Sequence, residues 1–317
     1  MKDIMSGTPH SNYLLLSFDV EDWFQVENFK QWIPLSSWSS FDLRVEKNTH
    51  CILDLLDTIT LPSCAESCCP HPQKKNTPRA TFFVLGWIAK RLPQLVREIQ
   101  TRGHEVASHG YGHALCDQER LTNLTEDLAD SKRLIEDTLG VPVYGYRAPS
   151  FSISSSVLEV IQKSGYSYDS SFNSFGAHSR YGKLELSRCE KVGIAVKISD
   201  TFHELPISNL RIRNRIIPWG GGGYFRLIPQ FLFRAGVQSI LKRDGAYLFY
   251  LHPWEIDPGQ PRVRRVSRKY RFRHYVNLRL SLERLRAFIR AFQTCRFVSC
   301  HDYLRLLARE DYPSEAP

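Results

Sequence analysis

Three carboxylates lie within four positions in the segment SFDVEDWFQ, residues 17–25, directly after the apolar run at 14–16. Asp19, Glu21 and Asp22 would repel one another, and a buried carboxylate without a partner is costly to desolvate. The cluster is interpreted either as loop acids that water solvates or as acids that surround a bound cation. The choice depends on whether other residues could complete a cation site.

His109 and His113 could complete such a site, because they lie four positions apart in the segment SHGYGH. On a helix this spacing puts both imidazoles on one face, but Gly110 and Gly112 disfavour a helix, and a tight loop could hold a cation equally well. Two neutral imidazoles and one carboxylate leave a divalent ion with open positions for water and substrate, which is typical of catalytic metal sites. The two histidines therefore favour a catalytic metal site that uses one of the acids.

The choice of the carboxylate ligand stays open at this point. Side chains alternate along a strand, so Asp19 and Glu21 share one face and Asp22 points to the other. Glu21 is favoured as the ligand if the extended path continues, whereas Asp22 could serve if the chain turns at once.

Arg147 and His252 are two further candidates for chemistry. Arg147 lies in GYRAPSF close to Pro149, whose ring fixes the local backbone, and its guanidinium could pair with Asp19 and keep that carboxylate ionised. His252 follows an apolar run in YLFYLHPWEID and precedes Pro253. An imidazole with a pKa near neutrality is suited to protonate a leaving amine.

The elements that must position these residues alternate along the chain. Apolar segments rich in β-formers, such as YLLLSF, ATFFVLG and AYLFYLH, are separated by stretches with helical apolar spacing. This alternation predicts an α/β fold with a parallel sheet covered by helices, in which functional residues collect at the carboxyl ends of strands. Five polar residues follow predicted strands and are expected to share one pocket: Asp19, His109, Arg147, Asp169 and His252.

The length of 317 residues and the 42% apolar composition allow one large domain, and the sequence shows no internal repeat or low-complexity linker. We therefore predict a single domain over residues 1–317. Residues 253–317 differ in character, since no acid lies between Asp257 and Glu283, and they are expected to form a C-terminal extension packed on the body of the domain.

The formal charge of +9 suits a partner that carries negative charge. No recognition fold accompanies the basic and aromatic residues between Arg262 and Arg273, so nucleic-acid binding is not predicted. Peripheral contact with an anionic membrane or with lipid-linked intermediates is expected instead. The sequence shows no membrane-spanning run and no secretory signal, which predicts a cytoplasmic protein with peripheral membrane contact.

The cysteines are expected to be reduced thiols rather than disulfides. Three of the eight lie in the segment CAESCCPH, where Cys64, Cys68, Cys69 and His71 superficially resemble a metal knuckle. A structural zinc site normally needs two ligand pairs, so a polar surface insertion is favoured here.

The segments SFDVED, SHGYGH, GYRAPSF, YDSS and LHPWE, in this order, resemble the motifs of the polysaccharide deacetylase family, carbohydrate esterase family 4. The segments ELPIS, GGGGYFRLIP and HPWEIDPGQPR resemble the subgroup associated with bacterial exopolysaccharide biosynthesis. The resemblance implies a deformed (β/α) barrel and one divalent metal ion, usually zinc. It also implies removal of N-acetyl groups from amino sugars.

The resemblance assigns roles by position. Asp19 matches the general base, His109 and His113 match the two metal-binding histidines, and Arg147 matches the arginine that holds the base. Asp169 falls in the fourth motif. Leu251 and His252 match the final motif, whose histidine is the general acid. The residues expected to contact the substrate are Ser150, Asp169, Trp219 and Leu251.

The sequence departs from the family pattern at two positions. Val20 stands where the family usually has a second aspartate, so the carboxylate ligand must be Glu21 or Asp22. Ser150 stands where a tyrosine is common, which should be tolerated if this residue offers only its backbone N–H to the oxyanion. Trp219 and the glycines 220–223 are interpreted either as a sugar platform or as a tight loop.

The function predicted from these residues is metal-dependent hydrolysis of N-acetyl groups on amino sugars of a poly- or oligosaccharide. One alternative is a metal-dependent amidase that acts on a small amide that is not a glycan. Another is a catalytically silent basic protein that binds glycans or membranes. A silent protein should have lost one of the site residues, whereas Asp19, His109, His113 and His252 are all present.

Overall fold

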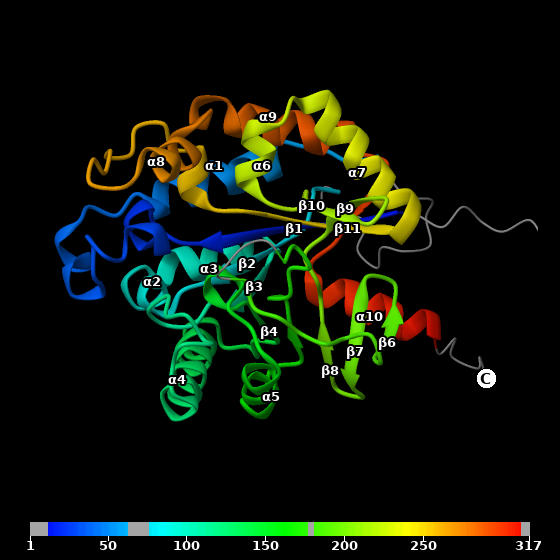
Figure 1. Ribbon diagram of the computed structural model, residues 1–317, viewed down its shortest axis with the longest axis horizontal. Coiled ribbons are helices and arrows are strands. Elements are labelled where there is room, and N and C mark those ends of the chain that lie inside the picture. Colours follow the sequence, from blue (N-terminus) through cyan, green and yellow to red (C-terminus); the bar gives the residue numbers. More distant parts are fainter. Residues whose placement is uncertain (1–11, 63–75, 177–180, 312–317) are drawn as a thin grey trace, which may run out of the picture.

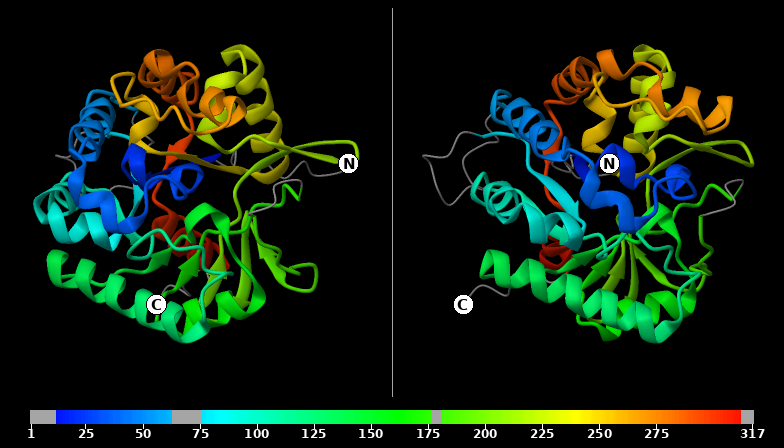
Figure 2. Two further views of the ribbon diagram at one scale, coloured as in Figure 1. Left: turned by 60° about the vertical axis from the view of Figure 1, so that its left-hand side comes forward. Right: turned by 90° about the vertical axis from the view of Figure 1, so that its left-hand side faces the viewer.

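The structure, a computed structural model, describes residues 12–62, 76–176 and 181–311. A curled sheet covered by helices forms the body of the protein (Figure 1 and Figure 2). The strands of this sheet, in spatial order, are β11 (Ala246–Leu251), β1 (Tyr13–Val20), β2 (Ala80–Val84), β3 (Glu105–Ser108), β4 (Gly145–Tyr146), β5 (Tyr168–Asp169), β8 (Phe202–Glu204), β7 (Ala195–Ser199) and β6 (Glu190–Val192), and β12 (Arg296–Phe297) also pairs with β1. Strands β9 (Asn209–Ile212) and β10 (Arg215–Pro218) form a separate antiparallel hairpin.

Ten α-helices are present in the described residues: α1 (Val45–Asp57), α2 (Gly86–Arg91), α3 (Pro93–Thr101), α4 (Leu121–Leu139), α5 (Ser155–Lys163), α6 (Gly222–Leu227), α7 (Gln230–Asp244), α8 (Arg268–Tyr275), α9 (Leu278–Ala291) and α10 (Cys300–Asp311). Five short 3₁₀ helices connect other elements: η1 (Trp23–Gln25), η2 (Glu27–Phe29), η3 (Leu35–Ser40), η4 (Pro149–Phe151) and η5 (Pro253–Ile256). Figure 1 shows α4 and α5 on one side of the sheet and α6 to α9 on the other.

Strand β1 brings Asp19, from the start of the chain, close to His252, which lies more than 200 residues later. It pairs in parallel with β11, and in this register Phe18 lies opposite Leu251. The residues that follow them, Asp19 and His252, therefore leave neighbouring strands at the same edge of the sheet. Parallel strands buried on both faces are apolar throughout, which explains why the LLL run at 14–16 shows no alternation of polar residues.

The two faces of β1 nevertheless contact different cores. Leu14, Leu16 and Phe18 pack under the outer helices, in the larger apolar cluster. Leu15 faces the inside of the curled sheet, in a smaller cluster that also contains Phe83. Because side chains alternate, the residues after Leu15 on the inner face are polar, and the last of them in the strand is Asp19.

The predicted α/β barrel is confirmed as a curled, open sheet with helices around it. Its first seven strands in spatial order run parallel, whereas β7 and β6 are antiparallel, and the path ends at β11 and β6. Residues after 253 do more than pack on this body, because β12 joins the main sheet beside β1. The insertion from Cys64 to Cys69 lies outside the described residues.

Local sequence signals set several helix ends. Pro93 opens α3 at a position where its missing N–H is not needed, and Ser154 accepts a hydrogen bond from the Val157 N–H at the start of α5. Helices α4 and α7 end at Gly140 and Gly245, both at φ +70°, where glycine avoids the steric cost of a Cβ. Within the described residues, no helix combines the length and the apolar character needed to cross a bilayer.

Trp219 is packed against α7 at one glycine. Its indole stacks on Phe233 with ring centroids 5.6 Å apart, and its Nε1–H donates to the Phe233 carbonyl at 2.9 Å. A Cβ at Gly236 would lie 2.3 Å from the indole ring, so the close approach of this helix depends on the absence of a side chain.

The first prediction follows from this contact. Gly236→Ala should lower the free energy of unfolding by about 1–3 kcal/mol, because the added methyl group overpacks the core against Trp219. Urea denaturation would measure the change. Gly223→Ala in α6 is the matched control, since nothing lies within 4 Å of its added Cβ and alanine favours a helix. Equal stability of the two variants would contradict the packing argument.

Candidate active site

Arg147 holds Asp19 from inside the sheet. Its Nη1 donates to Asp19 Oδ1 at 2.7 Å and to Ser17 Oγ at 2.8 Å, and its side chain is fully buried. Its Nε and Nη2 donate to the carbonyl and the hydroxyl of Ser170, and its guanidinium lies 4.0 Å from the centroid of the Phe83 ring. The pairing expected from the sequence is thus present, and it fixes the direction of the Asp19 carboxylate.

Glu21, His109 and His113 form a buried group whose ligand atoms all lie within 4.8 Å of one another. Glu21 Oε1 lies 3.3 Å from His109 Nε2 and 3.2 Å from His113 Nε2. His109 Nδ1–H donates to the Arg147 carbonyl at 2.7 Å, which fixes the ring so that Nε2 faces Glu21. Two imidazole nitrogens and a carboxylate that converge in this way fit a divalent metal ion.

The charge state of Glu21 suits the same role. Burial raises the pKa of this carboxyl group, but the neighbouring His113 and His252 side chains, with a hydrogen bond from His109, hold it well below its usual range. Glu21 is therefore ionised at neutral pH and able to act as a ligand.

Asp22 does not belong to this group, which corrects the alternative that the sequence left open. Its Oδ1 accepts a hydrogen bond from the Trp23 N–H at 2.8 Å, and its Oδ2 accepts from the N–H groups of Arg44 and Val45 at 2.6 and 2.8 Å. The chain turns into η1 directly after Glu21, so Asp22 caps that turn and the start of α1. Its oxygens are occupied by backbone donors rather than available to a metal ion.

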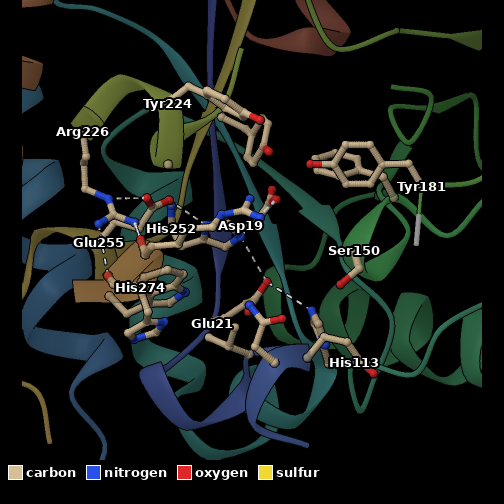
Figure 3. A pocket seen from close by; sticks show the side chains of 18 of the residues that line it. Asp19, Glu21, His113, Ser150, Tyr181, Tyr224, Arg226, His252, Glu255 and His274 are labelled. Carbon is tan, nitrogen blue, oxygen red and sulfur yellow. Dashed lines mark hydrogen bonds and ion pairs between the residues drawn. The ribbon is translucent and has the colours of Figure 1, made fainter. Parts of the chain in front are cut away.

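His252 faces the acids from the end of β11. Its Nε2 lies 3.4 Å from Glu21 Oε1 and 3.8 Å from Asp19 Oδ2. Its Nδ1–H donates to Glu255 Oε1 at 2.8 Å, and Glu255 Oε2 accepts from Arg226 Nε at 2.7 Å. This chain of contacts fixes the ring so that Nε2 points into the site (Figure 3).

The carboxylate of Glu255 contacts the His252 ring at Nδ1 and helps to raise its pKa. Burial raises the pKa of Glu255, but Arg226 and His252 together lower it to about 2. Burial lowers the pKa of His252, whereas Glu21 and Glu255 raise it well above its usual value. Sequence reasoning quoted the HPWE segment without assigning Glu255 a role. Glu255 lies three residues after His252, with Pro253 between them, and this spacing brings its carboxylate to the His252 ring. That spacing is the sequence signal that could have identified Glu255.

Asp127 shapes the loop that carries both histidines, and sequence reasoning missed this residue. It lies on α4, and its two oxygens accept from the Tyr111 N–H at 3.0 and 3.2 Å. Gly110, at φ +72°, brings the backbone close, since a Cβ there would lie 3.0 Å from Asp127 Oδ1. Burial raises the pKa of Asp127 to about 6. One carboxylate from α4 thus holds the turn between His109 and His113.

Asp19, Glu21, His113 and His252 line one pocket together with Ser150 (Figure 3). Ser150 has φ +53°, an uncommon conformation for a residue with a side chain, and such strain is often found at functional sites. Aromatic side chains add apolar surface to the walls. The remaining lining residues are Val26, Glu27, Asn28, Ala148, Phe151, Tyr181, Gly223, Tyr224, Arg226, Tyr250, Trp254, Glu255, Arg273 and His274.

Three predicted substrate contacts lie elsewhere and are corrected here. Trp219 is 9% exposed and packs in the core against α7, so it offers no sugar platform, although Gly223 of the same segment does line the pocket. Leu251 is fully buried at the end of β11, because its side chain points to the outer helices rather than to the inner face.

Asp169 is the third of these residues, and its hydrogen bonds hold the backbone next to the site. Its oxygens accept from the Ser171 hydroxyl at 2.6 Å and the Ser171 N–H at 3.1 Å, and the same hydroxyl accepts from the Ala148 N–H at 2.7 Å. Burial, and then the neighbouring Asp169, raise the pKa of Glu204 well above its usual range. Asp169 therefore braces the backbone beside Arg147 and does not touch the pocket.

Comparisons with known proteins agree with this picture. The polysaccharide deacetylase family matches residues 71–168, and a domain of unknown function, DUF3473, matches residues 170–305. His109, His113 and Arg147 fall in the first match and His252 in the second, whereas Asp19 precedes both. The fold joins residues that the two matches separate.

Individual relatives are similar over part of the chain. A peptidoglycan-N-acetylglucosamine deacetylase of Bacillus cereus is 30% identical over 87 residues, which are 27% of this chain and 40% of the relative. A chitooligosaccharide deacetylase of Azorhizobium caulinodans is 26% identical over 123 residues, which are 38% of this chain and 58% of the relative. The chain thus covers well under two thirds of the length of either relative.

A solved structure is similar over nearly the whole chain. The structure of a proposed polysaccharide deacetylase from Mycobacterium smegmatis aligns with a TM-score of 0.61 over 96% of this chain and 93% of that one, at 17% sequence identity. At this identity the similarity establishes the shared fold.

The second prediction separates the two acids that the sequence could not. Glu21→Ala should abolish stoichiometric binding of a divalent metal ion with little change in stability, because it removes a converging ligand. Asp22→Ala should keep metal binding and lower the free energy of unfolding by about 1–3 kcal/mol, because it leaves three backbone N–H groups without their acceptor. Elemental analysis and urea denaturation of both variants would measure this. The reverse pattern would restore Asp22 as the ligand.

The third prediction concerns the histidine loop. Asp127→Ala should weaken metal affinity by roughly 10- to 100-fold, the range expected when a group that orients metal ligands is lost. Competition with a chromophoric chelator would measure the affinity. Asp130→Ala is the matched control, because Asp130 is exposed on the same helix, where it pairs with Arg133. Equal affinities in the two variants would remove Asp127 from this role.

Proposed function

We propose that the chain is a metal-dependent hydrolase of the polysaccharide deacetylase family, whose model matches residues 71–168, and that it removes N-acetyl groups from amino-sugar residues of a poly- or oligosaccharide. One observation carries the proposal. Asp19 Oδ2 and His252 Nε2 lie 3.8 Å apart, and the same His252 Nε2 lies 3.4 Å from Glu21 Oε1 of the group formed by Glu21, His109 and His113. A proton acceptor and a proton donor thus lie together beside a set of metal ligands.

Asp19 and His252 each carry out one of the proton transfers of amide hydrolysis. Asp19, held by Arg147, accepts the proton of the attacking water through Oδ2, since Oδ1 is engaged by the guanidinium. His252 donates a proton from Nε2 to the leaving amine of the sugar, while Glu255 holds the opposite ring nitrogen. Each residue therefore needs a buried partner to keep the reacting atom directed into the pocket.

Glu21, His109 and His113 would hold one divalent ion, for which we propose zinc on the basis of the mixed nitrogen and oxygen ligands. Such an ion supplies Lewis acidity, which polarises the acetyl carbonyl and lowers the pKa of water. The protein keeps these ligands in place through the Arg147 carbonyl and the Asp127 carboxylate.

The walls of the pocket favour a sugar. Tyr181, Tyr224 and Tyr250 line it, and aromatic faces pack well against the apolar face of a pyranose ring. Figure 3 shows Tyr224 and Tyr181 on one side of the pocket and Glu21 with His113 on the other. We propose that the protein acts in exopolysaccharide biosynthesis. We also propose that it contacts an anionic membrane or lipid-linked intermediates.

The fourth prediction tests the activity. The protein loaded with a divalent metal ion should release acetate from N-acetylglucosamine oligomers in preference to small linear or cyclic amides, and removal of the metal with a chelator should abolish this. Asp19→Asn and His252→Ala should each lower kcat by about 10²- to 10⁴-fold, the usual contribution of general acid–base catalysis.

His301→Ala is the control for His252→Ala, because His301 stacks on Tyr144 away from the pocket and should tolerate the change. Near wild-type acetate release by Asp19→Asn or His252→Ala would remove that residue from its proposed role. Preference for small amides would replace the glycan substrate. Failure of the metal-loaded protein to release acetate from any acetylated substrate would favour a silent binding protein.

A further inference from the structure

Large apolar side chains are exposed mainly on one side of the molecule. Seven of the eleven that are exposed among the described residues lie between positions 212 and 280. They include Phe231, 72% exposed, Phe272, 60% exposed, and Leu280, 53% exposed. Six of the seven lie on α6 to α9, the exception being Ile212 of β9, and Figure 1 shows these helices on the side of the sheet opposite α4 and α5.

Three of these residues lie within one helical turn of the hydrogen bonds that join α6 and α7 to α9. Asn277 Nδ2, at the start of α9, donates to the Arg226 carbonyl at 2.8 Å, and Leu227 is the next residue of α6. Gln230 Nε2, at the start of α7, donates to the Arg284 carbonyl of α9 at 2.9 Å, and Phe231 is the next residue of α7. Leu280 precedes Arg284 by four positions and thus shares its face of α9.

The stretches of the chain that form these helices are rich in positive charge. Two stretches, residues 205–243 and 258–282, contain fifteen of the 42 lysine and arginine residues and none of the 33 acidic residues. The rest of the chain therefore has 27 basic and 33 acidic residues, so the net charge of +9 arises from these two stretches. Arg264, Arg265 and Arg268 are among the exposed residues of the second stretch.

We propose that α6, α7, α8 and the start of α9 form a docking face for a bilayer that contains anionic lipids. Arginine and lysine side chains attract the anionic headgroups, and exposed Phe231, Leu232 and Leu280 can enter the boundary between headgroups and acyl chains. A soluble polyanion would engage the basic residues but would gain nothing from exposed phenylalanine and leucine side chains. The combination of charge and apolar surface therefore favours a membrane.

The docking face adjoins the pocket through two shared helices. Helix α6 contributes Tyr224 and Arg226 to the pocket and exposes Leu227, whereas α8 contributes Arg273 and His274 to the pocket and exposes Phe272. Docking through this face would bring the pocket close to the lipid surface. The inference rests on the membrane contact that is part of the proposed function, and it assigns that contact to specific residues.

The fifth prediction tests the docking face by co-sedimentation with vesicles. The protein should bind vesicles of phosphatidylcholine with 30% phosphatidylglycerol, and bind pure phosphatidylcholine vesicles at least tenfold more weakly. The double variant Phe231→Ser and Leu232→Ser should lower the affinity for anionic vesicles at least tenfold. The triple variant Arg268→Gln, Lys269→Gln and Arg271→Gln should lower it similarly and weaken its dependence on salt.

Matched controls change residues on the opposite side of the sheet. Leu121→Ser removes an exposed apolar side chain of α4, and Arg120→Gln with Arg133→Gln and Lys163→Gln removes three exposed charges. Both controls should bind anionic vesicles like the wild type. Equal losses in controls and docking variants would overturn the assigned face, and circular dichroism would verify that every variant is folded.

Two other outcomes would also overturn the proposal. The first is the absence of wild-type binding to anionic vesicles at low salt. The second is binding to a soluble anionic polysaccharide that exceeds vesicle binding and is unchanged in Phe231→Ser with Leu232→Ser, which would assign the face to a polyanion. Acetate release from soluble oligomers is measured separately, so failure of docking is distinguishable from failure of the deacetylase proposal.

Discussion

Two fully buried arginines, Arg147 and Arg226, are the constraint on which the site depends. A buried guanidinium is costly unless its N–H groups find partners, so each arginine must be surrounded by acceptors. Arg147 finds them in Asp19, Ser17 and Ser170, and Arg226 finds them in Glu255 and in the carbonyl groups of Arg273, His274 and Val276. The first set fixes the proposed base, and the second fixes the residue that orients the proposed acid.

These pairings also answer the question posed by three acids after a buried strand. Asp19 is compensated by Arg147, and Asp22 is compensated by three backbone N–H groups at two helix starts. Only Glu21 remains directed at imidazole nitrogens. The like charges are tolerated because each one faces a different partner, and the acid whose carboxylate is engaged by neither an arginine nor backbone N–H groups is the one placed to bind a metal ion.

Sequence patterns predicted the alternating fold and the residues at the strand ends because both depend on local apolar periodicity. They could not predict which side of a strand end a residue occupies, and for this reason Asp169 and Leu251 were expected in a pocket that neither reaches. Trp219 was considered as a sugar platform, whereas it packs in the core. Only the packed structure shows that the absence of a side chain at Gly236 leaves space for its indole ring. Asp127 and Glu255 act through contacts with backbone or a neighbouring side chain, and no pattern of spacing in the strands points to them. The single domain and the cytoplasmic location stay predictions.

Arg226 connects the proposed acid to the proposed docking face. It binds Glu255, which orients His252, and the same guanidinium donates to three carbonyl groups around the end of α8. Trp254 stacks between His252 and His274, with centroids 5.2 and 4.2 Å from the two rings, and adds a second connection between the same elements. Because both connections are buried, α8 cannot shift far without disturbing the direction of His252. A lipid surface that contacts α8 would therefore meet a rigid wall of the pocket, so docking would orient the pocket toward the membrane without requiring it to open or close.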